Sequence, residues 1–329
     1  MDFSLLPKVE LHLHLDCSLS FDVVSVIDPS ITKQDYLQNF IAPDKCTNLA
    51  DFLTRAVTGF TLMQTKEQLN LVVHDLFKQM KADNMLYAEI RFAPLLHIEK
   101  GLTPFEVVAA IESATAAAVK ETGIEARLIL CTLRHYTEAQ SMETVQLVEQ
   151  FKNTYVAGFD IAGDEAGFPI DAHIKAFQYA KEKSIPCAAH AGEASNASSV
   201  WETLEHFGPS RIGHGVRSYE DDALVKHLQK HKIHLELCPT CNVQINICNA
   251  YKDHPIDKLY KAGVSVNINT DCRTICNIDL NREYKKMHEV FGWTTDDFYN
   301  TNALAINASF IDTELKTTLL NKLKAGYNK

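Results

Sequence analysis

The chain has little basic charge and no long hydrophobic run. Its 329 residues carry 32 lysines and arginines against 42 aspartates and glutamates, which gives a formal net charge of −10. Because neutralising phosphates requires clustered Lys and Arg, this balance argues against a nucleic-acid partner. No uncharged apolar segment approaches the ~18 residues of a membrane span, and the first residues do not resemble a secretory leader. We therefore expect a soluble, cytoplasmic protein without a membrane partner.

Disulfide frameworks, linkers and nucleotide-binding loops are also missing. The nine cysteines are odd in number and scattered, so we expect reduced thiols. No Gly-x-Gly-x-x-Gly loop follows any predicted strand, which argues against an open doubly wound sheet. No Pro-, Gly- or Ser-rich linker and no low-complexity tract divides the chain. We therefore assign residues 1–329 to one domain.

Short β-branched or alternating segments recur along the chain, mostly separated by helical stretches. One helix start is marked by a capping box, in which Thr103 precedes Pro104 and Glu106. Eight strand-then-helix units within roughly 300 residues predict an α/β fold, a closed (β/α)8 TIM barrel whose catalytic residues lie at the C-terminal strand ends. The predicted strands cover about residues 9–15, 86–93, 126–133, 156–161, 186–190, 211–214, 233–238 and 264–269.

Two helical segments extend this barrel. Residues 17–84 are too long for one crossover and carry apolar patches that include Leu49, Phe52 and Leu53. Since long loops at the active face of a barrel often form lids, we predict a helical, lid-like insertion after the first strand. The alternative is that these apolar residues pack on the barrel exterior. We expect C-terminal helices at about residues 296–329.

The first predicted strand carries its polar groups on one face. Successive side chains of a strand point to opposite faces, so His12, His14 and Asp16 share a surface. Two imidazoles at positions i and i+2 of a strand can reach one zinc ion. Among fourteen histidines such a pair arises about once by chance, so its weight depends on its context.

Five segments with polar residues at predicted strand ends follow one another along nearly the whole chain. They are Pro7–Asp16, Asp160–Glu165, His190–Glu193, Arg211–Gly215 and Asn269–Asp271. One such motif is weak to moderate evidence, but in this order and at these intervals the five closely resemble the adenosine deaminase family. The resemblance implies a zinc-dependent barrel enzyme that hydrolyses adenosine, and 2′-deoxyadenosine as well, with release of ammonia in purine salvage.

His12, His14, His190 and Asp271 are the predicted metal ligands. Three imidazoles and one carboxylate make a zinc-binding set that leaves a position open for water. Zinc suits the chemistry, because it lowers the pKa of bound water from 15.7 to about 7. We predict one Zn2+ per chain. The fourth predicted strand ends at Gly163 without the lysine that bridges two metals in related hydrolases, which favours a mononuclear site.

Glu193, His214 and Asp271 are the predicted catalytic residues. Glu193 follows His190 by three residues, and we expect it to protonate purine N1, a step that general acids speed by roughly 10²–10⁴-fold. To act as an acid near neutral pH, Glu193 needs a pKa raised by burial. The alternative is a carboxylate that caps the next helix. The resemblance implies that His214 orients and deprotonates the attacking water together with Asp271.

The resemblance also implies which residues bind the substrate. It implies that Gly163 offers its N–H to purine N3, that Asp16 contacts the ribose 5′-hydroxyl, and that His14 lies beside the nucleoside. A turn that requires positive φ is a second reason for glycine at position 163, and the two reasons are compatible.

Two cysteines depart from the family pattern. Cys272 stands where the family has a second Asp that bonds purine N7, and Cys17 stands where the family has Gly. A thiol is a weak donor, so we predict that Cys272 keeps this contact in a weaker form. Because Cys17 is bulkier than Gly, adenine, methylthioadenosine and other 5′-modified adenosines are alternative substrates. A non-catalytic nucleoside-binding protein is the alternative from another functional class.

Cys238 and Cys241 have Cys-x-x-Cys spacing. No second pair follows at a zinc-finger distance, since Cys248 and His254 are isolated. We interpret this stretch as part of the pocket rim, with Asn242 beside it. The predicted partner is therefore a small nucleoside, and no pattern in the sequence indicates an oligomeric state.

Overall fold

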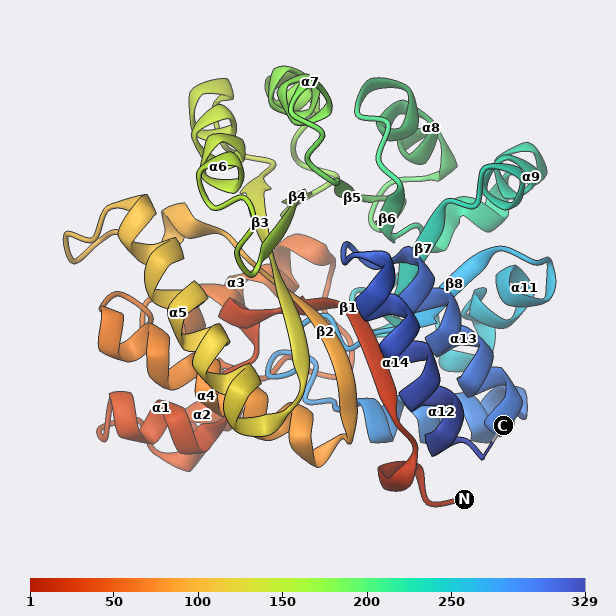
Figure 1. The fold of residues 1–329 in the computed structure, drawn as a ribbon, viewed down its shortest axis with the longest axis horizontal. Coiled ribbons are helices and arrows are strands. Elements are labelled where there is room, and N and C mark those ends of the chain that lie inside the picture. Colours follow the sequence, from red (N-terminus) through yellow and green to blue (C-terminus); the bar gives the residue numbers. More distant parts are fainter. Residues whose placement is uncertain (329) are drawn as a thin grey trace.

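Eight parallel strands form the centre of the computed structural model, which describes residues 1–328 (Figure 1). They pair in sequence order as two four-stranded sheets, β1 to β4 and β5 to β8. Each predicted strand overlaps an observed one. The strands are β1 (Lys8–His14), β2 (Met85–Phe92), β3 (Glu125–Leu133), β4 (Val156–Ala162), β5 (Ala188–Ala191), β6 (Arg211–His214), β7 (His234–Leu237) and β8 (Ser265–Ile268).

Backbone hydrogen bonds at two seams join the sheets into a barrel. Between β4 and the start of β5, the Phe159 N–H donates to the Pro186 carbonyl at 3.0 Å. Between β1 and the residues after β8, the Asp271 N–H donates to the His12 carbonyl at 3.1 Å. The His14 N–H in turn donates to the Asp271 carbonyl at 2.8 Å. The second seam is therefore made by three of the predicted metal ligands.

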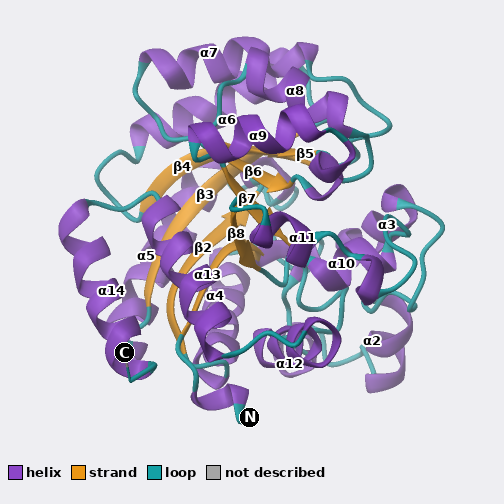
Figure 2. Cartoon of the chain, turned by 90° about the vertical axis from the view of Figure 1, so that its right-hand side faces the viewer, coloured by secondary structure: helices purple, strands orange, loops and turns teal. Residues whose placement is uncertain are grey.

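Helices surround the strands, as Figure 2 shows. The capping box is confirmed, since Thr103 Oγ1 accepts the Glu106 N–H at 3.2 Å and the Glu106 carboxylate accepts the Thr103 N–H at 3.0 Å. No helix among residues 1–328 is both long and apolar enough to cross a membrane. Lys329, the last residue of the predicted C-terminal helices, lies outside the described residues. The helices are α1 (Phe21–Ile27), α2 (Lys33–Asn39), α3 (Leu49–Phe60), α4 (Lys66–Ala82), α5 (Pro104–Thr122), α6 (Glu138–Gln150), α7 (Ile174–Glu182), α8 (Ala197–His206), α9 (Asp222–His231), α10 (Pro239–Gln244), α11 (Ile256–Lys261), α12 (Leu280–Phe291), α13 (Thr295–Ala308) and α14 (Thr313–Gly326).

Four helices, α1 to α4, lie between β1 and β2. Among them, α3 packs closely on the turn that follows β1: a Cβ at Gly59 would lie 2.6 Å from the Asp16 carbonyl oxygen. This close approach brings one face of α3 to the C-terminal end of the barrel. Leu49, Phe52 and Leu53 on that face line a cavity there. These three residues therefore face the candidate site, and their alternative placement on the barrel exterior is wrong.

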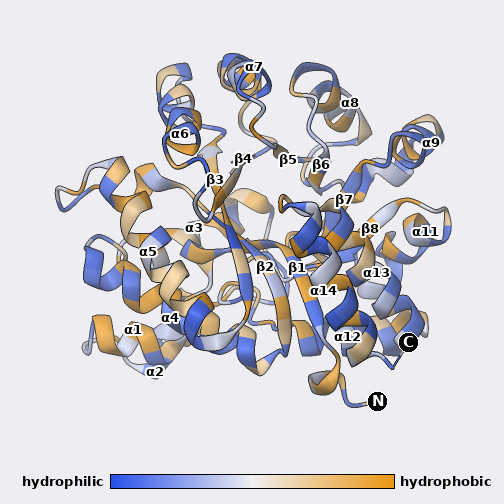
Figure 3. Cartoon of the chain, in the orientation of Figure 1, coloured by the Kyte–Doolittle hydropathy of each residue, from blue (hydrophilic) through white to orange (hydrophobic). Residues whose placement is uncertain are grey.

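Charged side chains lie inside the barrel, below its C-terminal end. Arg91 on β2 is fully buried and donates to Asp160 Oδ2 on β4 and to Glu236 Oε2 on β7, both at 2.7 Å. Arg211 on β6 forms ion pairs with Glu236 and with Glu89 on β2. Figure 3 shows the resulting mixture of hydrophilic and hydrophobic residues along the strands. Because buried ions need close partners, this network fixes the positions of Asp160 and Glu236.

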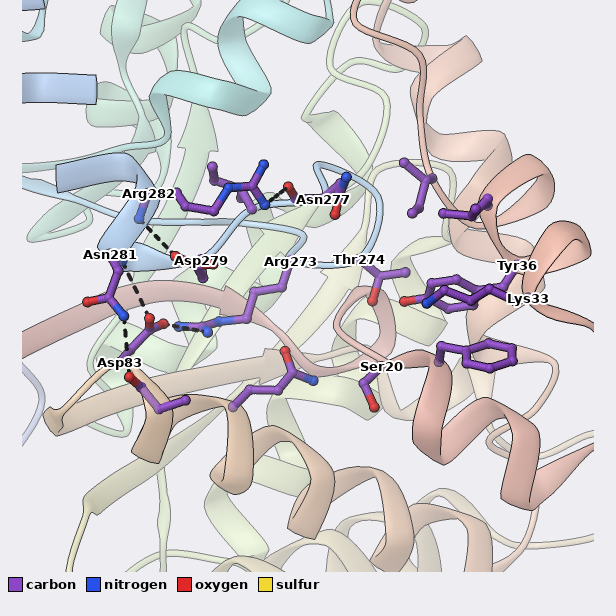
Figure 4. Close-up of a pocket in the computed structure, with 16 residues that line it drawn as sticks. Ser20, Lys33, Tyr36, Asp83, Arg273, Thr274, Asn277, Asp279, Asn281 and Arg282 are labelled. Carbon is purple, nitrogen blue, oxygen red and sulfur yellow. Dashed lines mark hydrogen bonds and ion pairs between the residues drawn. The ribbon is translucent and has the colours of Figure 1, made fainter. Parts of the chain in front are cut away.

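The loop after β8 is anchored by Arg273. Its guanidinium donates to Asp83 Oδ2 at 2.7 Å and to Glu10 Oε2 at 2.9 Å. The Leu280 N–H at the start of α12 donates to the same Asp83 carboxylate at 3.2 Å. Figure 4 shows Arg273 and Asp83 in the wall of a surface pocket next to α4 and α12. Breaking a buried ion pair costs about 3–5 kcal/mol, so these contacts hold the loop that carries Asp271.

Candidate metal centre

Four side chains converge at the C-terminal end of the barrel. His12 and His14 extend from β1, His190 extends from β5, and Asp271 follows β8. The Nε2 atoms of His14 and His190 lie 3.3 Å apart. Asp271 Oδ1 lies 3.3 Å from His12 Nε2 and 3.4 Å from His14 Nε2. Ligand atoms about 2.0–2.2 Å from a tetrahedral zinc ion are roughly 3.3–3.6 Å apart, so the spacing fits one ion of this size.

The protonation of two of these histidines also fits a metal. His12 Nδ1 lies 3.0 Å from Glu236 Oε2, and His190 Nδ1 lies 3.1 Å from Asp160 Oδ2. Because an ionised carboxylate only accepts, each Nδ1 carries the proton and each Nε2 keeps its lone pair. Burial lowers the pKa of His12 well below its usual value, which keeps the ring neutral. His12 Nε2 is buried without a hydrogen-bond partner, and a metal ion would supply that partner.

A chain of hydrogen bonds fixes the tautomer of His214 at the end of β6. The Ile256 N–H donates to His254 Nδ1 at 3.2 Å, and burial lowers the pKa of His254 to about 3, so this neutral ring carries its proton on Nε2. That Nε2–H donates to Asn242 Oδ1 at 3.1 Å, and the Asn242 amide donates to His214 Nδ1 at 3.2 Å. Burial also lowers the pKa of His214. Its one proton therefore stands on Nε2, 3.4 Å from Glu193 Oε1.

Glu193 lies on the turn after β5 and is 3% exposed. Burial raises its pKa well above the usual value, and the nearby Asp271 and Glu165 carboxylates raise it further. Glu165 builds the turn, because its carboxylate accepts the backbone N–H groups of residues 192–195 at 2.7–2.9 Å. The N-cap of the following helix α8 is Asn196. The alternative in which Glu193 caps that helix is therefore wrong.

The cavity above the histidines has a volume of about 60 Å³. Gly163 lines it with a backbone φ of 100°, which confirms the turn that requires glycine. Cys17 and Cys272 also line it, next to each other. Small-molecule pockets have volumes of about 300–1,000 Å³, so the cavity in this conformation is smaller than an ordinary ligand pocket.

Asp16 lies directly below this cavity wall, in the turn after β1. Its Oδ1 lies 3.9 Å from His14 Nδ1 and has no hydrogen-bond partner, while its Oδ2 accepts the Ala93 N–H at 3.4 Å. Burial raises the pKa of Asp16 to about 6. The side chain does not line this cavity, and the contact with a substrate hydroxyl stays a prediction.

The structure brings the predicted ligands together with Glu193 and His214, and it adds residues to which the sequence analysis gave no role. Glu165 was part of a recognised motif, which was the available signal. Glu236 alternates with apolar residues on β7, a pattern that gave no indication of its partner. Asn242 was assigned to the pocket rim with Cys241, but both lie deeper, since Asn242 contacts His214 and the Cys241 thiol donates to Glu193 Oε1 at 3.8 Å.

Comparison with known proteins identifies the family. The model of the family described as Adenosine deaminase matches residues 7–326. An adenosine deaminase from Clostridium acetobutylicum is 34% identical and covers 97% of this chain and 97% of its own length. This chain belongs to the adenosine deaminase family. As a member of that family, it is a metal-dependent hydrolase, which agrees with the grouping of His12, His14 and His190.

Solved structures share the barrel of this adenosine deaminase family member. An adenine deaminase from Arthrobacter aurescens has a TM-score of 0.91 at 23% identity and covers 98% of this chain and 100% of its own. A zinc-bound amidohydrolase from Burkholderia ambifaria also has a TM-score of 0.91, at 21% identity, and covers 99% of this chain and 92% of its own. At these identities the likeness concerns the fold alone, and the predicted (β/α)8 class is confirmed.

Proposed function

We propose that this chain catalyses the zinc-dependent hydrolytic deamination of adenosine and 2′-deoxyadenosine, with release of ammonia, in purine salvage in the cytoplasm. The observation that carries this proposal is the position of Glu193, a buried carboxyl whose pKa is raised, beside three imidazoles and a carboxylate. An acid and a metal-binding set in one buried site suit hydrolysis of an amino group from a purine ring. We further assign residues 1–329 to one domain, in which residues 17–84 act as the lid.

His12, His14, His190 and Asp271 are the residues that would hold the one zinc ion of each chain. A bound zinc ion supplies the Lewis acidity that makes water nucleophilic near neutral pH. Glu236 accepts the Nδ1–H of His12 and thereby orients the His12 ring. Partners of this kind set both the direction and the basicity of a metal ligand.

Glu193 delivers the proton that the ring requires. Attack of water on C6 pushes an electron pair onto N1, which must be protonated before the C6–N bond can break. Because its pKa is raised well above the usual value, the Glu193 carboxyl keeps its proton near neutral pH and donates it to N1. The exocyclic nitrogen then leaves as ammonia, after it has gained one proton of the attacking water. The other water proton leaves the new C6 hydroxyl as the carbonyl forms, and it restores the Glu193 carboxyl.

His214 and Asp271 have different roles toward the attacking water. The proton on His214 Nε2 makes this ring a donor, so it orients the water oxygen and does not take its proton. Asp271 can only accept when ionised. We therefore assign the removal of the water proton to Asp271 and the orientation of the water to His214.

Four residues would bind the nucleoside. The N–H of Gly163 faces purine N3, and His14 lies beside the base. The unpaired Oδ1 of Asp16 is suited to accept a hydrogen bond from the ribose 5′-hydroxyl. Cys272 donates weakly to N7, which leaves adenine, methylthioadenosine and other 5′-modified adenosines as alternative substrates.

Metal analysis and an ammonia assay test the proposal. Purified protein should carry about one zinc ion per chain and release ammonia from adenosine while the ultraviolet spectrum of adenine shifts. Tight nucleoside binding without ammonia would instead favour a non-catalytic nucleoside-binding protein. In a panel with 2′-deoxyadenosine, adenine, methylthioadenosine and AMP, AMP should be poor, because its phosphate meets the like charge of Asp16. Robust turnover of AMP would overturn the placement of Asp16.

A further inference from the structure

Six of the nine cysteines gather in one buried cluster beside the metal centre. Cys241 on α10 differs from an ordinary buried thiol, because its sulfur contacts two carboxylates of the site. Its Sγ lies 3.8 Å from Glu193 Oε1 and within 4.8 Å of a carboxylate oxygen of Asp271. The cluster consists of Cys17, Cys46, Cys238, Cys241, Cys272 and Cys276.

Glu193, Cys241 and Asp271 thus place one sulfur and two carboxylate groups around a common point. Their donor atoms all lie within 4.8 Å of one another, and each residue is at most 4% exposed. A zinc ion binds thiolate sulfur at about 2.3 Å and carboxylate oxygen at about 2.0–2.2 Å, which separates the two donors by roughly 3.5–3.7 Å in a tetrahedral site. The 3.8 Å between Cys241 Sγ and Glu193 Oε1 is close to this range.

We propose that Glu193, Cys241 and Asp271 form a second, inhibitory site for a thiophilic divalent cation, either cadmium or zinc in excess. A sulfur ligand selects such cations over Mg2+ and Ca2+, which prefer oxygen. Glu193 and Asp271 line the cavity, so a cation that enters meets both carboxylates, and Asp271, a ligand of the proposed zinc ion, would be shared by the two cations. Binding forms one metal–sulfur bond and metal–oxygen bonds, and it releases the protons of Cys241 and Glu193 to the solvent.

Occupation of this site removes the proton donor of the reaction. A Glu193 carboxylate that coordinates a cation has no proton for purine N1, so turnover stops while the first metal stays in place. This inhibition rests on the proposed role of Glu193, but the binding of the cation does not.

A cadmium titration of the zinc-loaded enzyme tests the proposal. We expect one additional cadmium ion per chain, an ultraviolet thiolate-to-cadmium charge-transfer band, and loss of adenosine turnover that a chelator reverses without loss of the zinc. Loss of an outer partner of a metal site already lowers affinity by about 10–100-fold, so Cys241→Ser should lose the band and bind this cadmium at least about tenfold more weakly. Glu193→Gln should also bind it more weakly. Cys46→Ser, a buried cysteine of the same cluster outside the three-residue group, is the matched control and should keep both the band and the affinity.

The outcomes separate this inference from the proposed function. The inference is wrong if the wild-type enzyme shows no thiolate band, if cadmium only replaces the zinc, or if Cys241→Ser keeps the band and the affinity. Mg2+ at the same concentrations should give no inhibition. If adenosine is not a substrate, the band and the metal content still report whether the second site exists.

Discussion

Two thiols distinguish the substrate end of this site from the family pattern. Cys17 and Cys272 both line the cavity and lie next to each other. A thiol is a weak donor to purine N7. The loss of a strong hydrogen bond costs about 1.5–3 kcal/mol when one partner is charged, so this pair of residues is expected to slow deamination.

Replacement of Cys272 by Asp should therefore raise kcat/KM for adenosine. Near Asp271 a second carboxyl keeps its proton, and a protonated carboxyl is a stronger donor to N7 than a thiol. We expect a gain of up to roughly 10–150-fold in steady-state assays. Cys272→Ala, which has no donor, is the control and should not gain. An unchanged or lower kcat/KM for Cys272→Asp would count against a role of this position at N7.

His214 and Asp271 share an unusual backbone conformation. Their φ values are 59° and 62°, in the left-handed region of the backbone that residues other than glycine seldom adopt. Such residues cost about 1–3 kcal/mol each and persist only where the surrounding structure holds them. Here the support for Asp271 is its pair of backbone hydrogen bonds with β1. Both residues assigned to the attacking water thus belong to the nine described non-glycine residues with a positive φ.

At the scale of the elements, side chains on α10 and in the loop after it set the position of the proton on His214, at the end of β6. Asn242 on α10 and His254 just before α11 together determine which nitrogen of His214 carries the proton. All three side chains are buried, which excludes water as a competing partner.

Asn242→Asp should reverse the tautomer of His214. A carboxylate at this position only accepts, so it would take the Nδ1–H of His214 and leave Nε2 without its proton, while His254 could still donate to it. Changes of this kind behind a functional imidazole cost roughly 10–100-fold, and we expect kcat to fall by that factor with KM and zinc content little changed. Nitrogen-15 NMR of the imidazole rings reads the tautomer directly. Asn249→Asp, at an exposed position of the same loop, is the control. An unchanged kcat together with a reversed tautomer would contradict the assigned role.

The sequence predicts elements better than it predicts the contacts between them. Strands such as β3 and β6 were predicted because a β-branched or alternating run is a local signal, and the helix after Thr103 was predicted from its capping box. Glu165 and Glu236 carry no local signal of this kind. Their roles follow from the turn or ring that each one contacts after residues distant in the chain have met, which only the assembled barrel provides.

At the scale of the whole molecule, the metal centre coincides with the seam between β1 and the residues after β8. His12, His14 and Asp271 exchange backbone hydrogen bonds across this seam, and their side chains form most of the ligand set. Closure of the barrel and formation of the ligand set are therefore one structural event.

Removal of the metal should lower the thermal stability of the entire barrel. An ion at 100 times its Kd that binds only the folded chain adds about 2.7 kcal/mol. For a large domain, 1 kcal/mol corresponds to roughly 2–4 °C, so we expect the Tm to fall by roughly 5–10 °C on chelation and to recover with zinc. Calorimetry of the loaded, stripped and reloaded protein measures this. Asp271→Ala should show no such recovery, and an equal Tm for loaded and stripped wild-type protein would disprove the link.

The position of this seam in the chain sets the order in which the metal ligands are synthesised. A ribosome delivers both histidines of β1 almost at once and His190 later, but Asp271 only after 270 of the 329 residues have been joined. Until then, the growing chain contains the histidine ligands but lacks the Asp271 carboxylate. It also lacks the Asp271 backbone groups that hydrogen-bond to His12 and His14. Maturation with metal is thus postponed until β8 and the residues after it have been made, when the first and last strands of the barrel can meet.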